Sequence, residues 1–224
     1  MNLQLFSTPG DDLQDILSAC RQVLEGREDP LIAYLPAASL SGKWQDFAEK
    51  AFAGLARVAT INPEIQTLPE MEMVLREAML VYISGGNTFL LNHRLHISKI
   101  MEYLRKKIAA GLPVVSFSAG TVLCGPNILT SSDMNMVGTG FFNGLNVTPF
   151  NFSVHYPVDQ TGRAFREDWL SEYHVFHENP VILLADGACV QVEGKKTTLV
   201  RGEAWILRKG QEKEKISPRI PIAP

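Results

Sequence analysis

Hydrophobic and polar positions follow two different patterns along the first half of the chain. Short continuous apolar runs, such as residues 31–35, are typical of strands buried in a parallel sheet. The segments between them, such as residues 11–24, have apolar positions at helical spacing, which predicts amphipathic helices. This alternation predicts an α/β fold, a three-layer sandwich with a mostly parallel sheet and helices on both faces. The other strands are expected at 2–7, 58–61, 79–83 and 113–117, and the other helices at 44–55 and 97–109.

The last third of the chain has a different pattern. Its short strand-like runs follow one another at close spacing, which predicts hairpins at one edge of the sheet. Because we find neither a repeat nor a linker, residues 1–208 are predicted to form one domain. The segment 209–224 is charged and then proline-rich, and we expect it to be loosely held. The expected elements here are strands at 152–155, 181–184, 188–192, 197–200 and 204–207, and a helix at 166–176.

Composition and charge narrow the possible functions. The 224 residues are 46% hydrophobic and 20% charged, which favours a folded core, and the formal charge of −3 gives no reason to expect nucleic acid or a membrane as partner. Three widely spaced cysteines predict neither a disulfide framework nor a zinc site. They favour a reducing compartment, and no signal peptide or membrane span is recognisable, so we expect the cytoplasm. Monomer and homodimer both stay open.

The sharpest chemical feature is an apolar strand, residues 113–117, that ends directly at Ser118. Ala119 and Gly120 follow, and such small residues allow a tight turn from strand to helix that projects a serine hydroxyl into open space. The helix after the turn would direct backbone N–H groups at a developing oxyanion. The usual elbow is Gly-x-Ser-x-Gly, and Ser116 replaces its first glycine. A serine that merely caps a helix is the alternative interpretation.

A second glycine-bearing turn, Gly85-Gly86-Asn87, also follows a predicted strand. Parallel strands open their turns at the same sheet edge, so the amides of Gly86 and Ala119 could form a two-donor oxyanion hole. Asn87 is then a candidate for substrate binding, or it caps the next helix.

His155 is the candidate general base, because it ends a strand-like run and follows Ser118 in the chain. The carboxylate that would orient it is either Asp186, at another strand end, or Asp133, in a polar turn. The other four histidines form two pairs at i, i+3 spacing near helix ends, and no carboxylate or cysteine pattern supports a metal there. These are His93, His96, His174 and His177.

Taken together, the motifs resemble the peptidase E (aspartyl dipeptidase) family of serine peptidases, from the first strand to about Leu207. The shared order of several short segments makes the resemblance fairly specific. They are Gly85-Gly86-Asn87-Thr88-Phe89, Ser118-Ala119-Gly120, Cys124-Gly125-Pro126-Asn127-Ile128, Ser132-Asp133-Met134, Gly144-Leu145-Asn146, His155, Arg166-Glu167 and Asp186-Gly187.

The resemblance implies a fold like the class I glutamine amidotransferases, with a serine in place of their cysteine. It implies a nucleophile at Ser118, a base at His155, the oxyanion hole proposed above, and no metal or other cofactor. The implied substrate is a short peptide with an N-terminal aspartate, whose carboxylate would meet Arg166. Asp186 stands where the family usually has a glutamate before a glycine. Because it also lies at a strand end beside a glycine, we favour Asp186 as the acid, and Asp133, which matches a family aspartate that has been assigned a relay role, is the alternative.

The chain departs from the family pattern around the expected substrate pocket. Ser153-Val154-His155 replaces Asn-Pro-His, and the segment between His155 and Arg166 lacks a His- and Gly-rich stretch. These changes bear on specificity more than on hydrolysis. A cyanophycinase-like enzyme, a broader peptidase and a non-catalytic binding module are the alternatives. A glutaminase would need a cysteine at position 118, and Cys124 is expected in the core.

Overall fold

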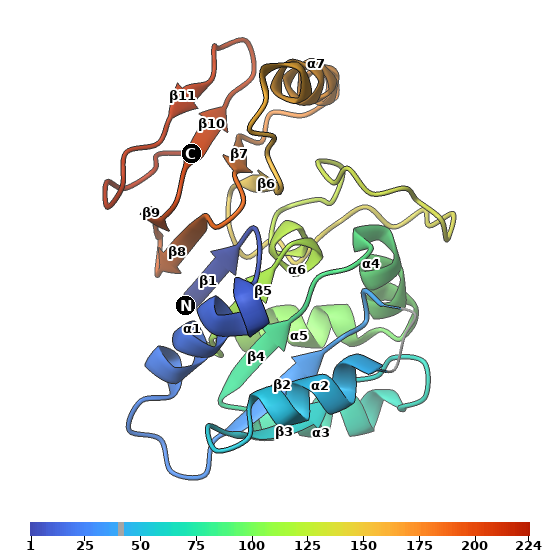
Figure 1. The fold of residues 1–224 in the computed structure, drawn as a ribbon. Coiled ribbons are helices and arrows are strands. Elements are labelled where there is room, and N and C mark those ends of the chain that lie inside the picture. The colour runs from blue at the N-terminus through green and yellow to red at the C-terminus, as the bar shows by residue number, and fades with distance from the viewer. Residues whose placement is uncertain (40–42) are drawn as a thin grey trace.

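The computed structural model describes the backbone of residues 1–39 and 43–224, and the side chains of 1–39 and 46–224. Over these residues the chain forms a seven-stranded sheet and a four-stranded sheet (Figure 1). The order of the larger sheet is β3-β2-β4-β5-β1-β8-β9, and its first five strands run parallel. Its strands are β1 (Asn2–Phe6), β2 (Leu31–Leu35), β3 (Arg57–Thr60), β4 (Leu80–Ile83), β5 (Val114–Phe117), β8 (Cys189–Glu193) and β9 (Lys196–Arg201).

Helices cover both faces of the larger sheet, so the predicted α/β class is confirmed. On one face, α1 (Gln14–Leu24), preceded by the 3-10 turn η1 (Asp11–Leu13), and α2 (Lys43–Ala51) pack against the sheet. The opposite face carries the other helices of this part. They are α3 (Leu68–Glu77), α4 (Thr88–Ile97), α5 (Ile100–Ala109) and the short α6 (Ala119–Leu123).

The smaller sheet corrects the expectation that the last third adds only edge hairpins. β8 and β9 form such a hairpin, but the remaining strands build a separate sheet in the order β11-β10-β7-β6. β7 is buried along its whole length, because α7 covers one side of it and the main core covers the other. The elements are β6 (Asn151–Ser153), α7 (Gln160–Phe176), β7 (Val181–Leu184), β10 (Ala204–Leu207) and β11 (Glu214–Lys215).

The segment 209–224 is held by backbone hydrogen bonds, contrary to the prediction of a loose tail. β11 pairs with β10, and the buried side chain of Ile216 joins the main core. Further on, the Ile222 N–H donates to the Thr197 carbonyl at 2.8 Å. The charged residues and prolines, on which the prediction of a loose tail was based, lie around Ile216 and Ile222. These two apolar residues pack against the main core. None of the helices in the described part of the chain is long and apolar enough to cross a bilayer.

Candidate active site

Ser118 occupies a strained turn between β5 and α6. Its backbone has φ 51° and ψ −118°, a conformation that residues with a side chain rarely adopt. Hydrogen bonds hold the turn on both sides: the Ser118 N–H donates to the Phe6 carbonyl at 3.1 Å, and the Ser118 carbonyl accepts from the Thr121 and Val122 amides. A sharp turn of this kind directs the serine side chain away from the sheet, as a nucleophile elbow requires.

The packing of this turn explains why Ser116 can replace the usual elbow glycine. Ser116 is completely buried, and its Oγ lies 3.1 Å from the Thr121 Oγ1, so its hydroxyl has a partner. The close approach occurs instead at Gly120, where a Cβ atom would collide with the carbonyl oxygen of Ile83. The departure at position 116 therefore leaves the elbow geometry intact.

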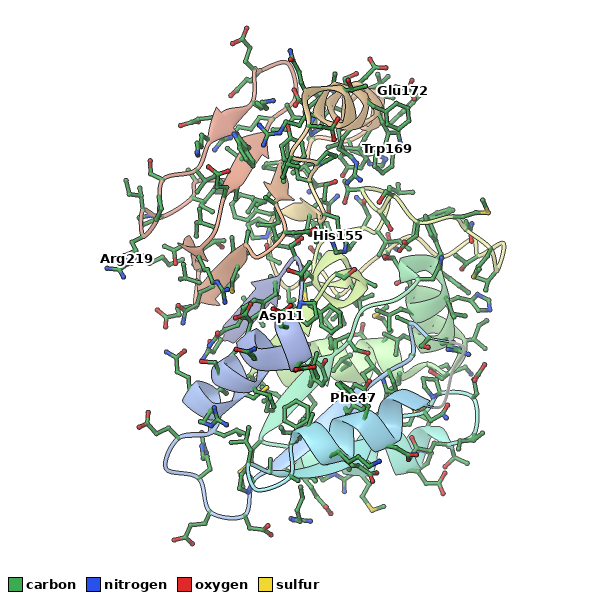
Figure 2. All side chains as sticks on the ribbon, viewed as in Figure 1. Asp11, Phe47, His155, Trp169, Glu172 and Arg219 are labelled. Carbon is green, nitrogen blue, oxygen red and sulfur yellow. The ribbon has the colours of Figure 1, made fainter. Side chains whose placement is uncertain are left out.

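Two hydrogen bonds connect Ser118 to a histidine and a carboxylate. The Ser118 Oγ lies 2.9 Å from the His155 Nε2, and the His155 Nδ1 lies 2.7 Å from the Asp186 Oδ1. β6 and β7 run parallel with Ser153 paired to Leu183, so the residues just past both strand ends meet at one edge of the smaller sheet. Figure 2 shows His155 where this part of the molecule meets the larger sheet.

Asp133, the other candidate acid, lies at the start of α4 and not at His155. Its Oδ2 accepts hydrogen bonds from the Thr88 N–H at 2.7 Å, from the Thr88 hydroxyl at 2.6 Å and from the Ser131 hydroxyl at 3.0 Å. A carboxylate that accepts from the first N–H of a helix and neutralises the positive end of its dipole is a capping group. The sequence favoured Asp186 as the acid, with Asp133 as the alternative, and the structure brings Asp186 to His155.

The end of β1 contacts all parts of this hydrogen-bond chain, which the sequence analysis missed. The Ser7 Oγ accepts from the His155 N–H at 2.9 Å and lies 3.3 Å from both the Asp186 Oδ1 and the Leu184 carbonyl. Next to it, the Thr8 Oγ1 accepts from the Gly187 N–H at 2.9 Å. Two hydroxyl residues directly after a buried strand, at the same sheet edge as the serine elbow, were the available signal.

The Gly85-Gly86 turn packs directly against the serine elbow. A Cβ atom at Gly85 would lie 3.0 Å from the Ser118 Cβ, and one at Gly86 would collide with the Ala38 carbonyl oxygen. Gly86 also has φ 134°, so both space and backbone conformation require glycine there. Ala119 is the first residue of α6, and its N–H therefore has no partner within that helix.

Asn87, expected at the substrate, is largely occupied with structural hydrogen bonds. Its Oδ1 accepts from the Leu90 N–H at 2.9 Å and caps α4, and its Nδ2 donates to the Met134 carbonyl at 2.9 Å. The capping interpretation of this residue is thus the one that the contacts support.

Arg166 projects from α7 to the end of β6, next to His155. Its Nη1 donates to the Ser153 Oγ at 2.7 Å and to the Val154 carbonyl at 3.1 Å. Among the residues that the structure describes, no acidic side chain forms an ion pair with Arg166, including its sequence neighbours Glu167 and Asp168. Burial lowers the pKa of its guanidinium. A half-buried cation of this kind is a suitable partner for a carboxylate.

The remaining candidate groups are structural. All three cysteines are buried, and burial raises the pKa of the Cys124 thiol to about 12, so it is a core residue. His96 stacks on Phe141 and His177 on Tyr173. Within the described ranges, no three or more His, Cys, Asp or Glu side chains come together as metal ligands would.

Comparison with known proteins assigns the family. The family model described as Peptidase family S51 matches residues 5–200. The chain belongs to peptidase family S51. This confirms the resemblance seen in the sequence motifs and makes the protein a peptidase by family.

Individual relatives of this S51 peptidase have related names. It is 28% identical over 224 residues to "Peptidase E" of Nostoc sp. strain PCC 7120, with 96% of this chain and 93% of that protein covered. It is 35% identical over 141 residues to the "Probable alpha-aspartyl dipeptidase" of Drosophila melanogaster, with 61% of this chain and 59% of that protein covered. Its fold is similar to the crystal structure of a peptidase from an acI-B1 Actinobacterium, with a TM-score of 0.74, 15% identity, and 99% and 96% of the two chains covered.

Proposed function

We propose that this S51 peptidase hydrolyses short peptides, dipeptides above all, that begin with aspartate, through a serine nucleophile and an acyl-enzyme. The observation that supports the chemistry is the continuous chain of hydrogen bonds from Ser118 through His155 to Asp186, with distances of 2.9 and 2.7 Å. A serine needs a base within about 2.6–3.2 Å to act as a nucleophile, and the base needs a third group to orient it.

The proposed reaction begins when the His155 Nε2 takes the hydroxyl proton of Ser118 as its Oγ attacks the scissile carbonyl carbon. The amides of Gly86 and Ala119 donate hydrogen bonds to the oxygen that becomes negative. Asp186 accepts the hydrogen bond of the Nδ1–H and thereby keeps the Nε2 free to act as the base. His155 then gives its proton to the leaving amine, and a water molecule, activated in the same way, hydrolyses the Ser118 ester.

Arg166 supports the preference for aspartate. Its Nη1 is bound to the end of β6, whereas its Nε and Nη2 have no acceptor among the described residues. The aspartate side chain of a substrate would supply the missing carboxylate in a bidentate pair. The name of the Drosophila relative points to the same substrate class. A cytoplasmic location stays a prediction from cysteine usage.

The test is a dipeptide panel of Asp-X, Glu-X, Asn-X and Ala-X on the wild-type protein and on Ser118→Ala. We expect Asp-X to be cleaved fastest, and Ser118→Ala to fold normally and lose at least about a thousandfold in turnover. Unchanged turnover in Ser118→Ala would reject the serine mechanism. A wild-type protein that prefers Ala-X to Asp-X would reject the aspartyl specificity alone.

A further inference from the structure

A cavity of about 520 Å³ opens next to the turn that carries Ser118. This volume lies within the range of roughly 300–1,000 Å³ that is usual for small-molecule sites. We call it the apolar pocket. Its lining is Leu13, Tyr34, Ala38, Ser39, Phe47, Ala48, Tyr82, Ser84, Gly85, Gly86, Asn87, Leu90, Phe117 and Met136.

The apolar pocket shares its inner wall with the proposed catalytic centre. Gly85 and Gly86 belong to both, and Phe117 immediately precedes Ser118 in the chain. A Cβ atom at Gly85 would collide with the Phe117 ring and lie 3.0 Å from the Ser118 Cβ, so the glycine turn packs directly against both Phe117 and the nucleophile. A substrate whose carbonyl oxygen binds the Gly86 amide therefore has part of its chain at the mouth of this pocket.

The chemistry of the lining selects an apolar group. None of the lining residues that the structure describes carries a charge. Tyr34 and Tyr82 are buried and stacked, with ring centroids 5.1 Å apart, and burial raises the pKa of both phenols, so they stay neutral. The Tyr34 hydroxyl is directed at the Ser84 Oγ, 3.4 Å away. A charged side chain placed here would lose its hydration without gaining a partner.

The pocket and Arg166 belong to different parts of the molecule. The described lining residues come from η1, β2 and the segment after it, α2, β4 and the turn after it, α4, β5 and the loop before β6. None of these described residues belongs to β6, β7 or α7. Arg166 lies on α7 beside the end of β6, on the His155 side of Ser118. Figure 2 shows Phe47 on α2, below His155 in the view, and Trp169 on α7, above His155.

We propose that the apolar pocket binds the side chain of the residue after the aspartate, so that the preferred substrates are Asp-X dipeptides in which X is large and apolar. This inference rests on the proposed function. A dipeptide has one side chain on each side of its scissile bond, and the site has two recognition features. If Arg166 binds the aspartate carboxylate, the uncharged pocket is left for X. Because the described part of the lining offers no cation, it also gives no advantage to a free carboxylate on X.

The first experiment compares kcat/KM for Asp-Leu, Asp-Leu amide, Asp-Phe, Asp-Ala, Asp-Lys and Leu-Leu on the wild-type protein. We expect Asp-Leu and Asp-Phe to exceed Asp-Ala by about 10- to 100-fold, the effect of burying a large apolar side chain. Asp-Lys should resemble Asp-Ala, and Asp-Leu amide should be cleaved about as fast as Asp-Leu. Equal values across all Asp-X dipeptides would overturn the pocket assignment while leaving the aspartate preference intact. A higher value for Leu-Leu than for Asp-Leu would instead overturn the proposed function.

The second experiment places a charge in the pocket. Phe47 has 41% of its surface exposed, so Phe47→Lys is compatible with folding, and Phe176→Lys on the distant end of α7, where the side chain is 83% exposed, is the matched control. We expect Phe47→Lys to lower kcat/KM for Asp-Leu by about tenfold or more, and to lower the ratio of kcat/KM for Asp-Leu to that for Asp-Ala. Phe176→Lys should change neither the value for Asp-Leu nor this ratio. Met136→Lys provides a second lining variant. An unchanged Asp-Leu to Asp-Ala ratio in both lining variants would overturn the proposal.

Discussion

The two candidate acids should respond in opposite ways to the same substitution. Asp186 contacts His155, and its side chain is 65% exposed, so it contributes little to the packing. Asp133 is partly buried and accepts three hydrogen bonds at the start of α4. Replacing each by asparagine keeps the shape of the side chain and removes its charge. We therefore expect Asp186→Asn to lose turnover with little change in stability, and Asp133→Asn to lose stability with little change in turnover.

The magnitudes follow from these contacts. The amide of Asp186→Asn can donate to the His155 Nδ1, which moves the ring proton to the Nε2 and prevents that nitrogen from acting as a base. A wrong tautomer of this kind costs about 10⁴ in turnover, or about 5.5 kcal/mol. Asp133→Asn weakens charged hydrogen bonds and the interaction with the helix dipole, which together contribute about 1–3 kcal/mol to the free energy of unfolding.

The assay pairs kcat on Asp-Leu with urea unfolding, on both variants and the wild-type protein. The free energy of unfolding of Asp186→Asn should lie within about 0.5 kcal/mol of that of the wild-type protein. Asp133→Asn should keep kcat within about tenfold. If Asp133→Asn loses more turnover than Asp186→Asn while both proteins remain folded, the assignment of the acid from hydrogen-bond geometry is wrong.

Three further substitutions test other contacts. Arg166→Met should reduce kcat/KM for Asp-Leu by an amount that corresponds to about 2–5 kcal/mol of transition-state stabilisation, and leave kcat/KM for Ala-Leu unchanged. An equal reduction for both dipeptides would show that the arginine is structural. Ser7→Ala should reduce kcat about tenfold and the free energy of unfolding by about 1 kcal/mol, because the partly buried His155 N–H loses its acceptor. Burial lowers the pKa of His174, so the free energy of unfolding should fall as the pH drops below about 6.5, where the unfolded chain binds the proton more readily. Urea titrations at several pH values should show a weaker pH dependence of the free energy of unfolding in His174→Gln. The same slope against pH in the variant and the wild-type protein would show that His174 is not its source.

The strands were the most predictable part of the fold. The expected ranges 31–35, 181–184 and 204–207 coincide with β2, β7 and β10, because strands buried on both faces consist of continuous apolar residues. The helix α4 was missed for the complementary reason. It is buried on nearly all sides, with even Asn92 and Arg94 inside, so its sequence lacks the polar face that produces a helical period.

The helix α3 was also missed, although its start is encoded locally. The Glu70 carboxylate accepts from the Thr67 N–H at 2.7 Å, and a proline occupies the first turn, which together form a recognisable N-terminal signal. The separate smaller sheet could not be predicted in the same way. Its pairing of β6 with β7 joins segments about thirty residues apart, and alternation within a strand does not identify its partner.

For the candidate site, the sequence identified the side chains better than their surroundings. Ser118, His155 and the favoured acid Asp186 follow from their positions at strand ends, but the register of the smaller sheet was needed to show that Asp186, and not Asp133, lies beside His155. The sequence also could not show that Asn87 and Asp133 both serve the start of α4. The same polar residue types occur at strand ends whether they cap a helix or face a substrate, so only their contacts distinguish the two roles.

The end of β1 explains how a site assembled from two sheets can keep its geometry. Ser118 and His155 both have positive φ, and each such conformation costs roughly 1–3 kcal/mol unless surrounding contacts hold it. The contacts come from one short segment: the Phe6 carbonyl binds the Ser118 amide, and the Ser7 hydroxyl binds the His155 amide and approaches Asp186. A shift of β1 would move Ser118, His155 and Asp186 together. Loss of the Ser7 hydroxyl would instead remove a contact of His155 and Asp186 only. For this reason Ser7→Ala should lower kcat more than it raises KM, and activity should recover in part with Ser7→Thr, which restores the hydroxyl.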